Sequence, residues 1–178
     1  MLRFLRIALL PLEPLAEHLC VDGSGTLDPN PRRRTMSIQI QGLCPLLEVF
    51  DMPTSIGFYR DVLGFEIVRT SQPERGDDVG WAWLRRDGAD LMLNTMYDDG
   101  MRPPEPDRRR TAAHHDTALF FGCPDPDEAY EHLRAHGHDP EPPVVQSYGM
   151  KQCYMRDPDG YNLCFQWPAT EAAAAAPA

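Results

Sequence analysis

The stretch YGMKQCYMRDPDGYNLCFQWP, residues 148–168, alternates like a β-strand on both sides of one interruption. The interruption is Asp157-Pro158-Asp159-Gly160, a turn sequence, so we expect two strands that meet at a tight turn. Successive strand residues point to opposite faces. One face of the second strand is apolar and carries Tyr161, Leu163, Phe165 and Trp167. The opposite face carries Asn162, Cys164 and Gln166. The first face is predicted to be core, and the second is a candidate surface for binding.

A strand, a helix and three more strands are predicted in the first half of the chain. Residues 40–49 alternate like a strand. In DMPTSIGFYRDVLGF, Asp51 is a suitable helix N-cap, Pro53 fits the first turn, and Gly64 ends the helix. Three strand-like runs follow, FEIVRT, VGWAWLRR and ADLMLNTM. The last two are joined by Asp87-Gly88, which predicts a two-residue hairpin.

The same order of elements recurs in the second half. DTALFFGC is predicted to be a strand and PDPDEAYEHLRAHG a helix that ends at Gly137. KQCYMRD and YNLCFQW then form the strands around the turn described above. The sequence therefore predicts two similar modules. The regions expected are a disordered extension (1–35), a folded domain (36–168) made of module one (about 40–96), a linker (97–115) and module two (116–168), and a disordered tail (169–178).

Charge and cysteine content limit the classes of partner. The formal net charge is -10 over 178 residues, which disfavours nucleic acid and anionic membranes and attracts cationic small molecules. The five cysteines are widely spaced and form no C-x-x-C pair, so we expect reduced thiols and a cytoplasmic protein. The apolar run at the N-terminus is interrupted by Pro11, Glu13 and Pro14, so no secretory signal or membrane span is predicted.

Two motifs carry a resemblance to a known family. VFDMPTSIGFYRDVLGFE in module one and YGMKQCYMRDPDGYNLCF in module two resemble the vicinal oxygen chelate superfamily, which includes glyoxalase I, extradiol dioxygenases and bleomycin-resistance proteins. The resemblance implies an α+β fold in which two βαβββ modules form a half-open, barrel-like cup. It also implies a homodimer with a cup shared between chains. The cup would be lined by the strand faces turned away from the helices.

Metal-dependent members of that family place four ligands, usually His, Gln or Glu, on the first and last strands of the modules. Matching the motifs puts these positions at Cys44, Met92, Asp116 and Cys164. Thiol and thioether groups are poor ligands for hard divalent metals, so glyoxalase or extradiol chemistry by the usual route is disfavoured. A slip of one residue would bring His115 into the cup, which leaves a metal site of His115, Cys44 and Cys164 as an alternative.

The Asp87-Gly88 hairpin adds residues to the cup without reference to the family. A two-residue turn pairs Trp83 with Met92 and Trp81 with Asn94, and paired residues share a face. Arg85 and Asp90 form a further pair towards one end. On this register Glu48 and Asp116 also face inward, and a buried carboxylate needs a cationic partner, a proton or water.

These features predict a metal-independent protein of the bleomycin-resistance type, which binds a planar or cationic small molecule such as an antibiotic and needs no cofactor. The predicted ligand-binding residues are Cys44, Glu48, Trp81, Trp83, Met92, Asn94, Asp116, Asn162, Cys164 and Gln166. Two alternatives remain open. One is a lyase, isomerase or dioxygenase that uses a divalent metal, or Glu48 or Asp116 as a general base. The other is a soft-metal or arsenical sensor built on Cys44, Cys153 and Cys164.

Overall fold

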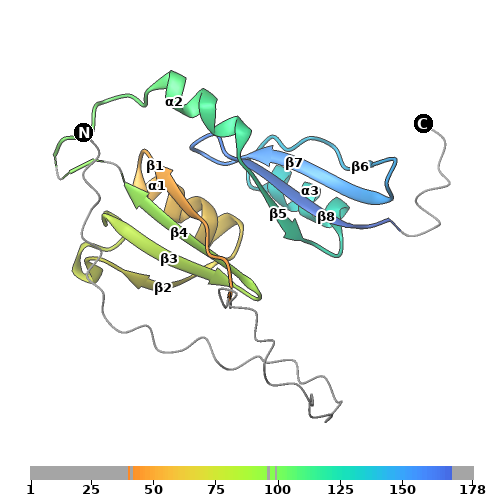
Figure 1. Ribbon diagram of the computed structural model, residues 1–178, viewed down its shortest axis with the longest axis horizontal. Coiled ribbons are helices and arrows are strands. Elements are labelled where there is room, and N and C mark those ends of the chain that lie inside the picture. The colour runs from red at the N-terminus through yellow and green to blue at the C-terminus, as the bar shows by residue number, and fades with distance from the viewer. Residues whose placement is uncertain (1–39, 41, 96, 99, 170–178) are drawn as a thin grey trace, which may run out of the picture. The chain divides into compact units, whose positions relative to one another are not determined.

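The computed structural model describes residues 40, 42–95, 97–98 and 100–169. They contain two four-stranded sheets (Figure 1). Both sheets belong to one compact unit, which begins at Cys44. The predicted disordered extension and nearly all of the predicted tail lie outside the described residues. Among the helices of the described segments, none has the length and apolar character needed to cross a membrane.

The first module follows the predicted order of elements. Its strands form a sheet in the order β1-β4-β3-β2, in which β1 runs parallel to β4. Its elements are β1 (Leu46–Val49), α1 (Met52–Gly57), the π-helix η1 (Phe58–Val62), β2 (Glu66–Thr70), the 3-10 helix η2 (Pro73–Arg75), β3 (Trp81–Arg86) and β4 (Ala89–Thr95).

The second module repeats this plan with the sheet order β5-β8-β7-β6. A helix and a 3-10 turn precede it, in the segment predicted to be a linker. The elements are α2 (Arg108–Ala113), η3 (His114–Asp116), β5 (Ala118–Gly122), α3 (Pro126–Ala135), β6 (Val144–Val145), β7 (Met150–Arg156) and β8 (Asn162–Pro168). The predicted α+β fold with two similar βαβββ modules is confirmed.

The helix of module one begins as predicted and ends differently. The Asp51 carboxylate accepts a hydrogen bond from the backbone N–H of Thr54 at 3.0 Å, which makes Asp51 the N-cap. The helix then widens into η1, in which the Leu63 N–H donates to the Phe58 carbonyl at 3.1 Å. The wider turn buries the consecutive aromatic side chains of Phe58 and Tyr59. Gly64 ends the helix with φ +73°, a conformation that favours glycine.

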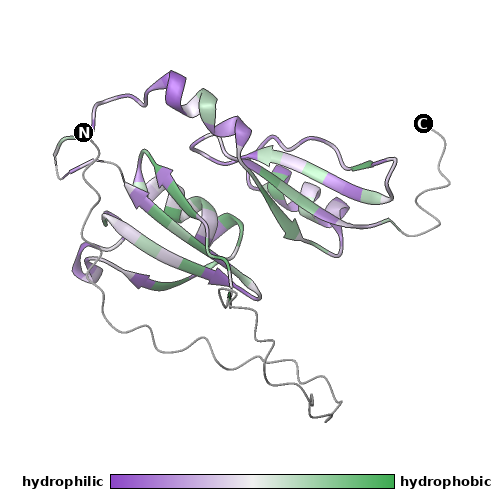
Figure 2. Cartoon of the chain, in the orientation of Figure 1, coloured by the Kyte–Doolittle hydropathy of each residue, from purple (hydrophilic) through white to green (hydrophobic). Residues whose placement is uncertain are grey.

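One face of each sheet forms the hydrophobic core. In the hairpin β3–β4, Ala82 pairs with Leu93 and Leu84 with Leu91, and all four are buried, as the register predicted. In module two, Leu163 is fully buried and Phe165 packs against the same core. The strand β5 is largely apolar, whereas α2 is mainly hydrophilic (Figure 2).

Three sequence predictions need correction, for Cys44, Asp116 and Trp167, and the predicted linker contains a helix that was not predicted. The first strand covers only Leu46–Val49, so Cys44 precedes it. Asp116 lies in the exposed turn η3 and not in a strand, because β5 starts at Ala118. The proposed linker contains α2, which Asp107 caps by accepting from the Arg109 N–H at 2.9 Å. Trp167, predicted to be core, is 45% exposed because it lies at the end of β8, beyond the part covered by the core.

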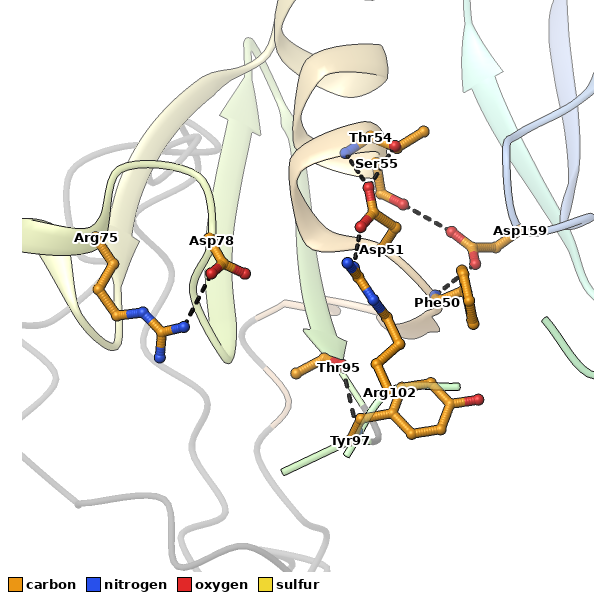
Figure 3. A network of polar contacts seen from close by, with 10 residues as sticks. All are labelled: Phe50, Asp51, Thr54, Ser55, Arg75, Asp78, Thr95, Tyr97, Arg102 and Asp159. Atoms are coloured by element: carbon orange, nitrogen blue, oxygen red, sulfur yellow. Dashed lines mark hydrogen bonds and ion pairs between the residues drawn. The ribbon is translucent and has the colours of Figure 1, made fainter. Parts of the chain in front are cut away.

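The turn between β7 and β8 joins the two modules. Asp159 is buried and accepts hydrogen bonds from the Phe50 N–H at 2.6 Å and the Ser55 hydroxyl at 2.7 Å (Figure 3). Asp157, also buried, accepts from the Tyr59 hydroxyl at 2.9 Å. These contacts satisfy buried polar groups of both modules. The two acidic residues of the DPDG turn therefore hold module two to the helix of module one.

Candidate functional site

The open face of the first sheet is the face opposite to its buried core. The hairpin register is confirmed, with Trp81 opposite Asn94, Trp83 opposite Met92 and Arg85 opposite Asp90. Residues that pair across neighbouring strands form a row on the sheet. The strand β1 extends two of these rows, because Leu46 pairs with Met92 and Glu48 with Asn94. All of these side chains are partly exposed, and Leu46 is 40% exposed. The residues of this open face that sequence reasoning predicted are therefore neighbours, and Leu46 joins them.

Glu48 is engaged by an amide on the open face. The Asn94 Nδ2 group donates to both carboxylate oxygens of Glu48, at 3.1 Å each. Glu48 also borders a hollow of about 10 Å³ that His114 and Arg110 help to line, with space for about one water molecule. Arg110 and His114 were not predicted as neighbours of Glu48, because the sequence did not indicate α2 and η3, which carry them.

The carboxylate of Asp90 organises the far end of the same face. It accepts from the Arg85 guanidinium at 2.8 and 3.2 Å and from the Trp83 indole N–H at 2.7 Å. The Arg85 guanidinium lies 5.0 Å from the centroid of the Trp83 ring, within range of a cation–π contact. Burial, followed by the charge of Asp90, raises the pKa of Cys44 nearby. Trp83 is therefore held in place before any ligand binds.

The open face of the second sheet centres on aromatic side chains that the sequence analysis did not select. Phe120 on β5 pairs with Cys164, and Tyr154 on β7 pairs with Cys164 from the other side. The rings of Phe120 and Tyr154 are 6.3 Å apart in an edge-to-face arrangement. Phe120 is 54% exposed, whereas Cys164 is fully buried. The alternation in ALFFG and KQCYMR could have identified both aromatic residues.

Amide groups extend this second face. Gln152 pairs with Gln166 across β7 and β8, and its Nε2 donates to the Gln166 Oε1 at 2.7 Å. The Gln152 Oε1 accepts from the hydroxyls of Tyr148 at 2.8 Å and Tyr154 at 3.2 Å. Asn162 lies at the other end of β8, where its amide donates to the His115 carbonyl at 2.5 Å. Asn162 and Gln166 therefore lie on the predicted face and are already bonded to protein groups.

The structure does not gather the four family metal positions into a ligand set. On β1 the residue paired with Met92 is Leu46, and on β5 the residue paired with Cys164 is Phe120. Asp116 is exposed and lies 3.1 Å from the imidazole of His115. In the described part of the chain, no three His, Cys, Asp or Glu side chains lie close enough together to hold a metal ion.

The cysteines proposed for a thiol sensor are separated by the sheet. Cys153 pairs with Phe165 on the core side of β7, and its thiol lies 3.4 Å from the Glu141 carbonyl. Cys164 faces the opposite side of the same sheet, and Cys44 belongs to module one. Burial raises the pKa of Cys153 to about 11 and also raises the pKa of Cys164. Both therefore favour the protonated thiol over the thiolate that binds metals.

A pocket of about 260 Å³ lies at the end of the first sheet, where β3 begins and β4 ends. Both arginines of its lining are paired: Arg75 bonds to Asp78 at 3.0 Å, and Arg102 pairs with Asp51, which lies outside the lining (Figure 3). The pocket contains none of the predicted ligand-binding residues. Its lining consists of Met52, Arg75, Asp78, Val79, Gly80, Thr95, Tyr97, Asp98, Gly100 and Arg102.

Residues 45–165, more than half of the chain, match the model of the Glyoxalase/Bleomycin resistance protein/Dioxygenase superfamily. The chain belongs to this superfamily. No curated protein matches it significantly in sequence. The two motifs that carried the resemblance in the sequence, residues 49–66 and 148–165, fall within the matched region. Superfamily membership, however, does not fix a reaction or a ligand.

Several solved structures of this superfamily resemble the chain. The bleomycin resistance determinant encoded on transposon Tn5 has 22% identity and a TM-score of 0.55, covering 74% of this chain and 100% of its own. The bleomycin-binding protein from Streptomyces verticillus, complexed with copper(II)-bleomycin, has 24% identity and a TM-score of 0.51, covering 76% and 100%. A superfamily protein from Nocardioides has 19% identity and a TM-score of 0.55, covering 80% and 93%. At these identities the likeness shows the fold.

Proposed function

We propose that this superfamily member is a small-molecule-binding protein that holds a planar ligand on the open face of its first sheet without a metal ion. The observation that carries the proposal is the pair of indoles, Trp81 and Trp83, side by side on that face and partly exposed. Aromatic rings attract flat molecules by stacking and by burial of apolar area. Binding would therefore rest on shape and stacking.

The donor set supports a mode of binding without metal. Of the four positions matched to the family's metal ligands, two are Met92 and Cys164, and their partners on β1 and β5, Leu46 and Phe120, carry no donor atom. A hard divalent metal needs several oxygen or nitrogen ligands. The general bases considered from sequence have weak support, because Glu48 is bonded to Asn94 and Asp116 is exposed in a turn.

Sequestration of an antibiotic in the cytoplasm is the biological role that we propose. Two structures of the same fold are described as a bleomycin resistance determinant and a bleomycin-binding protein. A protein that protects by binding needs an accessible surface of aromatic side chains and no catalytic groups. The four cysteines among the described residues are free thiols, which agrees with a reducing compartment.

We further propose that the protein is a homodimer in which each cup is shared between chains. Apolar side chains on both open faces are exposed in the single chain, with Leu46 at 40% and Phe120 at 54%. Contiguous exposed apolar surface typically marks a site of association. A second copy would cover these faces, so that the first sheet of one chain and the second sheet of its partner enclose the ligand.

A thermal-shift screen tests the proposal. The protein is dialysed against a chelator and heated with metal-free bleomycin and with a set of planar aromatic compounds. A ligand at one hundred times its dissociation constant stabilises the folded state by about 2.7 kcal/mol. We expect at least one such compound to raise the melting temperature.

Matched variants locate the site. Trp83→Leu should reduce the ligand response, while Trp167→Leu and Tyr97→Leu should keep it in full, because Trp167 lies at the exposed end of β8 and Tyr97 lines the separate pocket. Loss of the response in Tyr97→Leu alone would place the ligand in that pocket. A response that appears only with added metal would contradict the proposal.

A further inference from the structure

An irregularity in strand β2 brings an arginine to the open face of the first sheet. Glu66 pairs with Arg85 and Ile67 with Leu84, but the next pair is Arg69 with Trp83. Val68 is therefore the extra residue of a β-bulge. Without the bulge, Val68 would lie opposite Trp83, and Arg69 would lie opposite the buried Ala82. The bulge places a cationic side chain next to the tryptophan that is held in position.

The guanidinium of Arg69 is not used within the part of the chain that the structure describes. Arg69 is exposed, and its side chain has no hydrogen bond or ion pair with any residue of 40, 42–95, 97–98 and 100–169. Arg85, one row away on the same face, contrasts with it, because Arg85 is bound through two nitrogens to Asp90. With respect to the described residues, the Arg69 guanidinium is thus available as a donor of charge-assisted hydrogen bonds.

A second donor on this face also lacks an acceptor. Among the described residues, the indole nitrogen of Trp81 is a buried side-chain atom without a hydrogen-bond partner. Trp81 is in the row next to Trp83, on the side away from Arg85. A buried donor that stays unpaired is costly, and native proteins usually satisfy such groups. Two donors in neighbouring rows thus lack an acceptor among the described residues, and of the two the Arg69 guanidinium is the one exposed to a ligand.

The carboxylates of this face are poor candidates for binding a cation. Asp90 is neutralised by Arg85 and bonded to Trp83, and Glu48 accepts from Asn94. The side chain of Glu66 has no hydrogen bond or ion pair among the described residues. Glu66 lies opposite Arg85 in the sheet, however, so Trp83 separates its row from that of Trp81. A ligand that covers both indoles would therefore lie next to Arg69 and away from Glu66.

We infer that the ligand is a planar aromatic molecule with an anionic group, whose ring stacks on Trp83 and whose anion binds Arg69. This inference rests on the proposed function and specifies the ligand class for the same face. The net charge of -10 disfavours an anionic ligand at long range. A donor at contact distance nevertheless outweighs distant charges, because solvent screens them. Arg69 is a specificity-determining residue in this arrangement.

Three isosteric probes test the inference: naphthoate, naphthamide and naphthamidine, which are anionic, neutral and cationic. Calorimetric titration of the chelator-treated full chain should give the tightest binding for naphthoate, about tenfold tighter than naphthamide, as a charge-assisted hydrogen bond predicts. Arg69→Gln should remove this tenfold preference and leave naphthamide binding within about twofold. Glu66→Gln is the matched control on the same strand, and it should leave or strengthen naphthoate binding.

The outcomes separate this inference from the proposed function. Equal binding of naphthoate and naphthamide, or tightest binding of naphthamidine, would overturn the anionic class while leaving the stacking face intact. Unchanged naphthoate binding in Arg69→Gln would show that Arg69 only protects the sheet edge from pairing with other chains. Absence of binding for all three probes would overturn this inference, whereas the proposed function fails if no compound of the thermal-shift screen stabilises the protein. Circular dichroism confirms that each variant is folded.

Discussion

Asp157, in the turn that joins the modules, should make the stability of the protein depend on pH in a defined direction. Its side chain is 5% exposed. One carboxylate oxygen accepts from the backbone N–H groups of Asp159 at 3.0 Å and Tyr161 at 2.8 Å. The other oxygen accepts from the Tyr59 hydroxyl at 2.9 Å. Burial raises the pKa of Asp157 from 3.8 to about 6, against the opposing effect of the bond from Tyr59.

The sign of the effect follows from proton binding. In the unfolded chain Asp157 has its ordinary pKa, so between about pH 4 and pH 6 the folded state binds more protons than the unfolded state. The stability that this group contributes is therefore fully present below about pH 4 and is lost as the pH rises through about 6. The two pKa values differ by about 2, which corresponds to about 3 kcal/mol.

Asp157→Asn isolates this contribution. The Asn carbonyl oxygen can keep both backbone hydrogen bonds, and its NH₂ group can donate to the Tyr59 hydroxyl oxygen. Urea unfolding at several pH values gives the free energy of unfolding of the variant minus that of the parent. This difference should rise by up to about 3 kcal/mol between pH 4 and pH 7.5, because only the parent must bury a charge at neutral pH.

The control for this experiment is Asp87→Asn, because the Asp87 side chain is 94% exposed in the β3–β4 turn. Its difference from the parent should stay nearly constant over the same pH range. If Asp157→Asn and the parent give parallel pH profiles, the buried carboxylate does not titrate as argued. The role assigned to burial in the joining turn would then be wrong.

Four further predictions concern the site and the assembly. Trp83→Leu should weaken binding of a planar ligand by about 1–2 kcal/mol in calorimetry and stay folded, since stacking is lost but an apolar side chain remains; global unfolding would show that the indole is structural. Light scattering at micromolar concentration should report about twice the chain mass of 20.1 kDa, and a clean monomer would refute the shared cup. Elemental analysis should find no stoichiometric divalent metal in the purified protein, and ligand binding should persist after treatment with a chelator. Deletion of residues 1–35 should change the melting temperature by no more than about two degrees, and a large drop would show that the segment contributes to the fold.

The register of the first sheet was predictable because two local rules agree. Asp87-Gly88 specifies a two-residue turn, and the strict alternation in WAWLRR and ADLMLNT then fixes which residues share a face. The position of Arg69 was not predictable. Nothing in EIVRT marks a bulge, since the strand has no glycine and every residue but Glu66 suits a strand, so simple alternation assigns Arg69 to the wrong face.

In the second half of the chain, the structure differs from expectation where short elements or tertiary burial decide the outcome. The helix α2 has six residues within a segment rich in proline and charge, so composition indicated a linker. Trp167 keeps the alternation of its strand, but the strand extends past the core, and periodicity does not show where burial stops. Phe120 and Tyr154 follow the same alternation as the predicted residues and could have been included.

The most direct test of a stacking face without metal is the indole N–H spectrum of the three tryptophans. Isotope-labelled, chelator-treated protein is titrated with naphthoate, and single substitutions to Phe assign the three signals. Trp81 and Trp83 lie on the open face of the first sheet, whereas Trp167 lies at the end of β8 in module two. We predict that the signals of Trp81 and Trp83 shift together and saturate, while that of Trp167 stays in place. Saturable binding that leaves both Trp81 and Trp83 unshifted would contradict the account.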